Sequence, residues 1–161
     1  MKKPRIDEQA VVADGAVVLG DVTIKKDVSI WYNAVIRGDV NSISIGEGTN
    51  IQDLAVLHVD ADASLAIGKN VTIGHGAILH GCTIKDQALI GMGAIVLNGA
   101  VIGKGSMIAA GALVPQNTVV PDGALYMGNP AKFRRMLTEE ELTANLKNAA
   151  NYIKESKDLN N

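Results

Sequence analysis

A branched aliphatic residue returns at every sixth position along most of this 161-residue chain. The first run comprises Val12, Val18, Ile24, Ile30 and Ile36. Runs with the same step cover most of residues 45–120. Neither the period of an α-helix nor simple strand alternation gives a step of six, whereas a coil of three short strands joined by tight turns does. The repeat therefore predicts a β-solenoid whose aliphatic side chains point inward once per strand.

The composition suits the narrow interior of such a solenoid. Hydrophobic residues make up 47% of the chain but aromatic residues only 3%, so Val, Ile, Leu and Ala must form the core. Pairs such as Asp14-Gly15 and Asn98-Gly99 supply the positive φ that tight corner turns require. The period gains residues at 37–44 and 58–66, so we expect loops to project from the corners there. Repeat proteins place functional residues on such insertions.

The C-terminal part has a different pattern. Thr138 and Glu141 have the spacing of a helix capping box. Apolar residues follow at helical spacing, namely Leu142, Leu146, Ala149 and Ile153. We therefore expect a solenoid domain over residues 1–130, and a linker and amphipathic helix over residues 131–161. The helix itself should cover residues 138–157 and pack against the solenoid.

Charge and cysteine content exclude several classes of function. The net charge of −2 comes with no long basic run, so nucleic acid is not an expected partner. No stretch approaches the roughly 20 apolar residues of a membrane span, and the basic N-terminus leads into no signal-peptide core. We expect a soluble, cytoplasmic protein without a membrane partner. Cys82 is the only cysteine, which excludes an intrachain disulfide and favours a packing role over a nucleophilic one.

The repeat register brings two histidines together. Leu57 and Leu79 hold the same position in consecutive coils, so His58 and His80, which follow them, should project side by side. Neighbouring strands lie about 4.8 Å apart, and two imidazoles can then share one metal ion at about 2.0–2.1 Å each. Arg37 belongs to the same column, one coil earlier. A single histidine on a β-face is usually a satisfied polar residue, but this pairing favours a metal site.

The third histidine falls on the adjacent face of the triangular coil. His75 follows the repeat residue Ile73 by two positions, and Gln52 and Asp53 accompany it there. If three such prisms associate around a three-fold axis, this face of one subunit can meet the His58/His80 face of the next. The register thus predicts a homotrimer with a three-histidine site across each interface. An open fourth position would mark a catalytic rather than a structural zinc.

Arg37 and Asp53 would approach each other across the same boundary. Two readings of this pair remain open. It is either an ordinary salt bridge between subunits or a bidentate contact that orients the site. Gly76 and Gly81 permit close backbone approach beside the histidines.

Five segments carry a resemblance to a known family, and they are Arg37-Gly38-Asp39, Asn50-Ile51-Gln52-Asp53 followed by His58, His75-Gly76-Ala77-Ile78-Leu79-His80-Gly81-Cys82, Gly91-Met92-Gly93-Ala94 and Gly128-Asn129-Pro130-Ala131-Lys132. Together they resemble the gamma-class carbonic anhydrases and their bacterial relatives over nearly the whole chain. The resemblance implies an all-β solenoid of the left-handed parallel β-helix type, with hexapeptide repeats and a C-terminal α-helix.

The resemblance also implies a metal and a reaction. His58, His75 and His80 would bind zinc, or Fe²⁺ or Co²⁺, with two ligands from one subunit and one from its neighbour. A metal-bound hydroxide would then hydrate CO₂ reversibly to bicarbonate. Further residues are implied to shape this site: Gln52 would orient the hydroxide, Arg37, Asp39 and Asp53 would frame the site and the interface, and Tyr126 would sit near the substrate.

The chain departs from the family at the acids that shuttle protons. Val40 follows Asp39, and Ala61 lies three residues after His58, where the archetypal enzymes carry glutamates. Asp60 and Asp62 flank the second position as substitutes. Fast hydration needs efficient proton export, so the departures predict CO₂ hydration that is slow or absent even where the metal site is intact.

Three other functions compete with CO₂ hydration. A metal-dependent hydrolase, such as an acyl-coenzyme A thioesterase, could use the same three histidines. A hexapeptide-repeat acyltransferase would use a histidine base without metal, so metal analysis separates it from the others. In a non-catalytic trimeric scaffold, the metal would only join the subunits.

Overall fold

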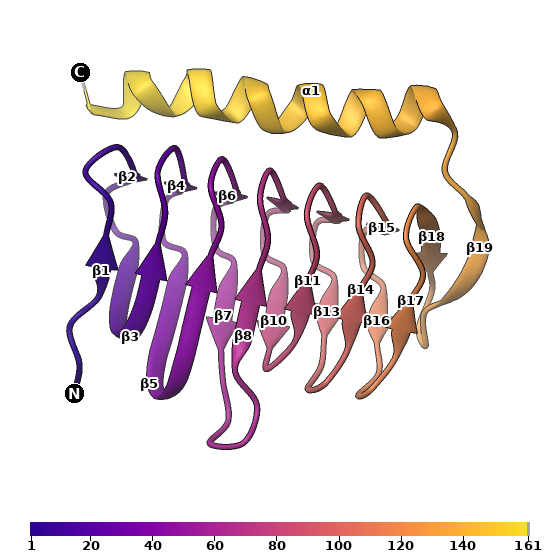
Figure 1. Cartoon of the computed structure of the whole chain (residues 1–161), viewed down its shortest axis with the longest axis horizontal. Helices are drawn as coiled ribbons and strands as arrows, with labels where there is room; N and C mark the ends of the chain where they lie inside the picture. Colours follow the sequence, from indigo (N-terminus) through magenta and orange to yellow (C-terminus); the bar gives the residue numbers. More distant parts are fainter. Residues whose placement is uncertain (161) are drawn as a thin grey trace.

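The computed structural model describes residues 1–160, which wind into a left-handed parallel β-helix of about seven turns with one long helix beside it (Figure 1). Its elements are β1 (Arg5–Ile6), β2 (Val11–Val12), β3 (Val17–Ile24), β4 (Ser29–Ile30), β5 (Val35–Ile45), β6 (Asn50–Ile51), β7 (Val56–His58), β8 (Leu65–Ile67), β9 (Thr72–Ile73), β10 (Ile78–His80), β11 (Thr83–Ile84), β12 (Leu89–Ile90), β13 (Ile95–Val96), β14 (Val101–Ile102), β15 (Met107–Ile108), β16 (Leu113–Val114), β17 (Val119–Val120), β18 (Ala124–Met127), β19 (Lys132–Met136), α1 (Glu139–Ser156) and the 3₁₀ helix η1 (Lys157–Asn160).

Each turn of the solenoid contributes a strand to each of three faces. The first face contains β7, β10, β13 and β16 together with the first parts of β3 and β5. The second face contains β8, β11, β14 and β17 together with the last parts of β3 and β5. The third face is a separate sheet in the order β19-β18-β15-β12-β9-β6-β4-β2. The long strands β3 and β5 therefore bend around the corner between the first two faces.

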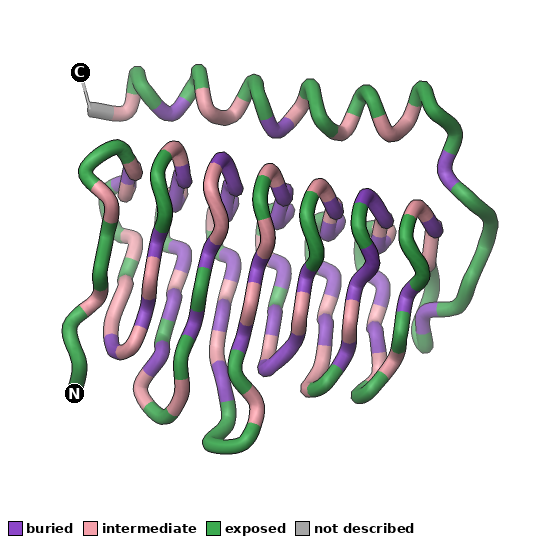
Figure 2. The backbone as a smooth tube through the Cα atoms, in the orientation of Figure 1, coloured by how far each residue is buried: buried purple, intermediate pink, exposed green. Residues whose placement is uncertain are grey.

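The inward column predicted from the six-residue step is confirmed. Ile36 pairs with Leu57, Leu57 with Leu79, and Leu79 with Val96, and all four side chains are fully buried. Burying one such side chain contributes roughly 1.5–3 kcal/mol. Figure 2 shows buried segments in every turn of the solenoid. The aliphatic core thus holds the corners, and the polar side chains on them, in register.

The outward columns differ from face to face. In the outward column that precedes the inward one, the first face carries only apolar residues, namely Val17, Val35, Val56, Ile78, Ile95 and Leu113. On the second face the residues of this column are mostly small or polar, namely Thr23, Ser44, Ala66, Thr83, Val101 and Val119. No described element of this chain covers the first face, which leaves a continuous apolar stripe beside His58 and His80.

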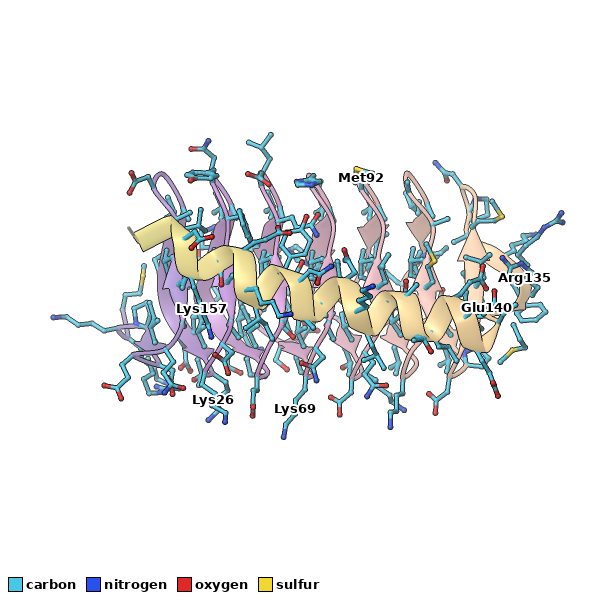
Figure 3. All side chains as sticks on the ribbon, turned by 90° about the horizontal axis from the view of Figure 1, so that it is seen from above. Lys26, Lys69, Met92, Arg135, Glu140 and Lys157 are labelled. Carbon is cyan, nitrogen blue, oxygen red and sulfur yellow. The ribbon has the colours of Figure 1, made fainter. Side chains whose placement is uncertain are left out.

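Helix α1 covers the third face, as Figure 3 shows from above. It begins after Thr138, whose hydroxyl accepts from the Glu141 backbone N–H while the Glu141 carboxylate accepts from the Thr138 backbone N–H, so the predicted capping box is confirmed. Ala149 is buried, and the Tyr152 ring packs edge-on against Trp31 with 5.4 Å between ring centroids.

No helix among residues 1–160 is both long and apolar enough to cross a membrane.

Two predicted irregular segments are more regular than expected. Residues 37–44 were predicted as a loop but continue β5 around the corner, because they pair with β3 across a single register shift. Part of the predicted linker after residue 131 forms β19, which returns antiparallel along β18 and supplies that edge with hydrogen bonds. Residues 58–66 do form a projecting loop, visible between β7 and β8 in Figure 1.

Candidate metal centre

His58 and His80 lie side by side at the corner between the first and second faces. They are the last residues of β7 and β10, and the strand register pairs them directly, as the repeat predicted. His58 Nδ1 lies 3.0 Å from His80 Nε2. The two rings are partly buried, with their planes inclined at 70°. One nitrogen of each ring therefore faces the same point.

The other nitrogen of each ring is held by an oxygen acceptor. His58 Nε2 lies 2.9 Å from Asp39 Oδ1, and His80 Nδ1 lies 2.5 Å from Asn98 Oδ1. Asn98 in turn donates from Nδ2 to Asp60 Oδ2 over 2.6 Å. A continuous chain of hydrogen bonds thus runs from Asp39 through both histidines to Asp60.

This chain of hydrogen bonds fixes which ring nitrogen of each neutral histidine carries the hydrogen. A carboxylate can only accept, so His58 carries its hydrogen on Nε2. The Asn98 amide gives its N–H to Asp60 and its oxygen to His80, so His80 carries its hydrogen on Nδ1. With both rings neutral, two lone pairs then face each other at 3.0 Å, an arrangement that a proton or a metal cation between them stabilises. A tetrahedral ion with bonds of 2.0–2.1 Å separates its ligand nitrogens by roughly 3.3 Å, so this pair would open slightly from 3.0 Å to hold one.

Asp39 is itself anchored by Arg37, which donates from Nη1 to Asp39 Oδ2. Burial would raise the pKa of the Asp39 carboxyl, but the hydrogen bonds from His58 and Arg37 outweigh burial and hold that pKa below its ordinary value. The carboxylate therefore stays ionised at neutral pH. Ligating histidines commonly donate their second N–H to such a carboxylate.

His75 lies at the opposite edge of the first face. The predicted column of Tyr32, Asp53, His75 and Met92 is confirmed by backbone hydrogen bonds that link successive corners. His75 Nδ1 is 2.7 Å from Asp53 Oδ2, and the side chain is 46% exposed. Figure 3 shows the row of corner side chains that includes Met92, projecting along one edge. Since Asp53 holds Nδ1, the second ring nitrogen of His75 is directed to solvent or to a neighbour.

One chain does not bring all three histidines together. His75 and His80 lie five positions apart along largely extended backbone, which corresponds to a distance on the order of 15 Å. Within residues 1–160 no group of three metal-ligating side chains of the His, Cys, Asp or Glu type converges. The three-histidine set therefore needs a second subunit.

The remaining predicted residues have different surroundings. Gln52 is buried next to the His75 corner, and its Nε2 donates to Asn50 Oδ1 over 3.0 Å. In this chain Arg37 binds Asp39 and Asp53 binds His75, so the pairing of Arg37 with Asp53 across an interface stays a prediction.

Tyr126 is not brought to the histidines of its own chain. It pairs with Ile108 in the inward column of the third face, three coils beyond the level of Ile73, and its ring packs on Phe133. The expectation that Tyr126 lies near the substrate therefore stays a prediction, which a histidine site of a neighbouring subunit would have to meet. Burial raises the pKa of the Cys82 thiol to about 12, in keeping with a packing role.

A groove beside His75 runs between α1 and the third face. Its volume is about 300 Å³, and its lining includes Gln52, Met92, Met107 and Tyr152. Most of the lining is apolar, and His75 and Gln52 are among its polar residues. No sequence pattern indicates this groove, because it depends on where the helix packs.

Two contact residues were also missed by sequence reasoning. Asn98 lies at the corner that follows His80 by one coil, and the repeat register alone could have identified this proximity. Asp60 was considered only as a proton carrier, whereas its carboxylate binds the Asn98 amide.

Fold and repeat together define a class, the hexapeptide-repeat proteins. The sequence model described as bacterial transferase hexapeptide (six repeats) matches residues 81–116. A solved structure of a hexapeptide transferase family protein from Anaplasma phagocytophilum superposes with a TM-score of 0.93 at 51% identity, covering 96% of this chain and 91% of the other.

Two curated relatives narrow the class. A probable carbonic anhydrase from Methanocaldococcus jannaschii is 53% identical, covering 96% of this chain and 97% of its own. The mitochondrial gamma carbonic anhydrase 2 of Arabidopsis thaliana is 52% identical over 94% of this chain, which spans only 57% of the plant protein. This chain belongs to the gamma carbonic anhydrase family.

Proposed function

We propose that this protein is a metal-dependent carbonic anhydrase that hydrates CO₂ reversibly to bicarbonate at a site shared between the subunits of a homotrimer. The observation that carries the proposal is the facing pair of nitrogens on His58 and His80, 3.0 Å apart, with each opposite nitrogen held by an oxygen. Similarity to the archaeal carbonic anhydrase over nearly the full length of both chains supports it.

The distribution of apolar side chains supports the trimer. The uncovered apolar stripe of the first face lies between the His75 corner and the His58/His80 corner. If each subunit places one edge of this face against the opposite edge of the next, the contact is heterologous and closes into a ring. A triangular prism suits closure by three, and each interface then holds His75 from one subunit and the histidine pair from the other.

The metal is proposed to be zinc. Three imidazole nitrogens form a donor set that zinc binds with an open fourth position, and Fe²⁺ or Co²⁺ suit the same ligands. When bound, such a metal acts as a Lewis acid and supplies hydroxide near neutral pH.

The protein's own residues would position the reactants. Because the Gln52 amide nitrogen is engaged by Asn50, its oxygen is left to accept a hydrogen bond from the attacking water and so to orient it. Asp39, ionised and anchored by Arg37, would keep the His58 ring in place. Asp53 would do the same for His75.

The apolar groove of about 300 Å³ beside His75 favours a second candidate function. CO₂ would occupy a small fraction of that space, whereas an acyl chain would fill it. A metal-dependent hydrolase of thioesters is therefore the alternative.

The cytoplasmic location expected from the sequence stays a prediction, since the plant relatives are named as mitochondrial.

The testing experiment compares two reactions on one preparation. Protein loaded with zinc, with Fe²⁺ or with Co²⁺ is assayed for CO₂ hydration by stopped flow and for cleavage of a short acyl-coenzyme A. Metal-dependent hydration that is lost in His80→Ala supports the proposal. Thioester cleavage without hydration in any metal form would replace the proposal with the hydrolase. Acyl transfer by metal-free protein would point to the transferase. If the protein binds metal but has none of these activities, the non-catalytic scaffold is the remaining function.

A further inference from the structure

Asn98 turns its side chain back toward the histidine pair from the next coil. Its Oδ1 lies 2.5 Å from His80 Nδ1, and its Nδ2 donates to Asp60 Oδ2 over 2.6 Å. Neither Asn98 nor Asp60 lies in the segments that carry the family resemblance. An amide presents a donor at one end and an acceptor at the other, so its orientation decides which hydrogen bond an adjacent imidazole makes.

We propose that Asn98, oriented by Asp60, is a positioning residue that fixes the tautomer of His80 and so directs the Nε2 lone pair at the metal site. The inference rests on the proposed metal site. Asp60 has only acceptor atoms, so it takes the amide N–H₂ group and leaves the amide oxygen for His80. His80 must then carry its hydrogen on Nδ1, which leaves Nε2 free to bind a metal.

The corner is built around this amide. The loop that carries Asp60 is pinned by Asn41, whose Nδ2 donates to the backbone oxygens of Asp60 and Ala61 at 3.0 Å each. Gly81 has a φ of +53°, and a Cβ there would lie 2.7 Å from Asn98 Oδ1. The glycine therefore leaves the space that the amide occupies, and the loop fixes the carboxylate that orients it.

Variants at Asn98, Asp60 and Asp62 separate the roles of Asn98 and Asp60. Asn98→Leu removes both ends of the amide at similar volume. Asn98→Asp alone places a second carboxylate against Asp60, whereas the double variant Asp60→Asn/Asn98→Asp rebuilds the pair in reverse, with the acceptor still facing His80. Asp62→Asn, an exposed acid two residues further along the same loop, is the matched control.

The first readout needs no metal. In metal-free protein in alkaline buffer, nitrogen NMR of the imidazoles should report His80 with its hydrogen on Nδ1. Asn98→Leu should shift His80 toward the Nε2–H form, since Nε2 can then donate to His58 Nδ1. The double variant and Asp62→Asn should keep the Nδ1–H form. Asp60→Asn alone, a single change on an exposed loop, should give a mixture and serves if Asn98→Leu does not fold.

The second readout is zinc affinity, measured by competition with a chelator. Loss of a hydrogen-bond partner behind a ligating histidine typically weakens metal binding about 10–100-fold, and we expect that loss for Asn98→Leu. Asn98→Asp and the double variant still offer His80 an acceptor and should keep most of the affinity, and Asp62→Asn should keep all of it. An unchanged tautomer and unchanged affinity in Asn98→Leu would overturn the inference. If the unaltered protein binds no zinc, the proposed function fails, while the NMR result still decides the role of Asn98.

Discussion

His58 Nδ1 and His80 Nε2 face each other at 3.0 Å, although the hydrogen bonds to Asp39 and Asn98 leave both atoms with lone pairs. Two such atoms repel unless a cation lies between them. The strand register imposes this proximity, because Leu57 and Leu79 pair directly in the core beneath the two rings. The aliphatic solenoid thereby holds a site that attracts a positive charge.

Single replacement of a histidine should remove the metal without unfolding the chain. His58→Ala, His75→Ala and His80→Ala each delete one of three proposed ligands, while the fully buried core is untouched. We expect bound zinc to fall at least about 10-fold in each variant, with the circular dichroism spectrum unchanged. Elemental analysis after gel filtration measures the zinc. Full metal content in all three variants would reject the ligand assignment.

The apolar stripe of the first face should be the subunit interface. Ile78→Asp places a charge in the middle of the stripe, where burial without a partner is strongly unfavourable. Sedimentation should report about three times 16.8 kDa for the unaltered protein and a folded monomer for Ile78→Asp. Val119→Asp is the control, because Val119 is more exposed, at 67%, but lies on the second face. Equal effects of both substitutions would contradict this assignment of the interface.

The helix cap should make stability depend on acidic pH. Hydrogen bonds from the Arg135 guanidinium and the Thr138 backbone N–H lower the pKa of Glu141 to about 2, from an ordinary value of 4.5. A lowered pKa stabilises the folded state above pH 4.5, and this contribution is lost as the pH falls toward 2. Glu141→Gln should therefore lower the thermal midpoint modestly at pH 7, and the difference should vanish near pH 2. A difference independent of pH would exclude the ion pair as its cause.

Proton export should limit the turnover of CO₂. Val40 and Ala61 are exposed where the family resemblance implies acids, so protons must pass to solvent or buffer. Raising the concentration of an imidazole-type buffer should raise kcat, and Ala61→Glu should raise it several-fold at low buffer. Stopped-flow hydration measures both effects. A buffer-independent rate of about 10⁵ s⁻¹ or faster, approaching the roughly 10⁶ s⁻¹ of the fastest carbonic anhydrase, would contradict this expectation.

Much of the fold and half of the site could be predicted from the sequence because a solenoid converts spacing into position. Because successive coils stack directly on one another, the repeat spacing determines which residue lies beside which. The pairing of His58 with His80 and the corner column of His75 were predicted in this way. The capping box at Thr138 is equally local. None of these predictions required knowledge of side-chain conformation.

The rest depended on side-chain direction and on contacts between distant segments. Asn98 could be placed at the right corner, but not its rotamer, which depends on Asp60 from a loop 38 residues earlier. The expectation that Tyr126 lies near the substrate stays a prediction, because its register in the inward column of the third face does not place it relative to a site between subunits. The strand assignment of residues 37–44 required the pairing with β3, which a six-residue period does not encode.

Mixing two inactive variants tests the shared site most directly. A His75→Ala chain keeps the histidine pair, and a His58→Ala chain keeps His75, so a site can re-form only where the two meet at an interface. After equal amounts are unfolded together and refolded into random trimers, about one quarter of the interfaces should be complete. We predict that bound zinc then rises from near zero in either variant to about one quarter of the unmixed, unaltered protein. Mixed trimers that bind no more zinc than either variant alone would contradict a metal site built between subunits.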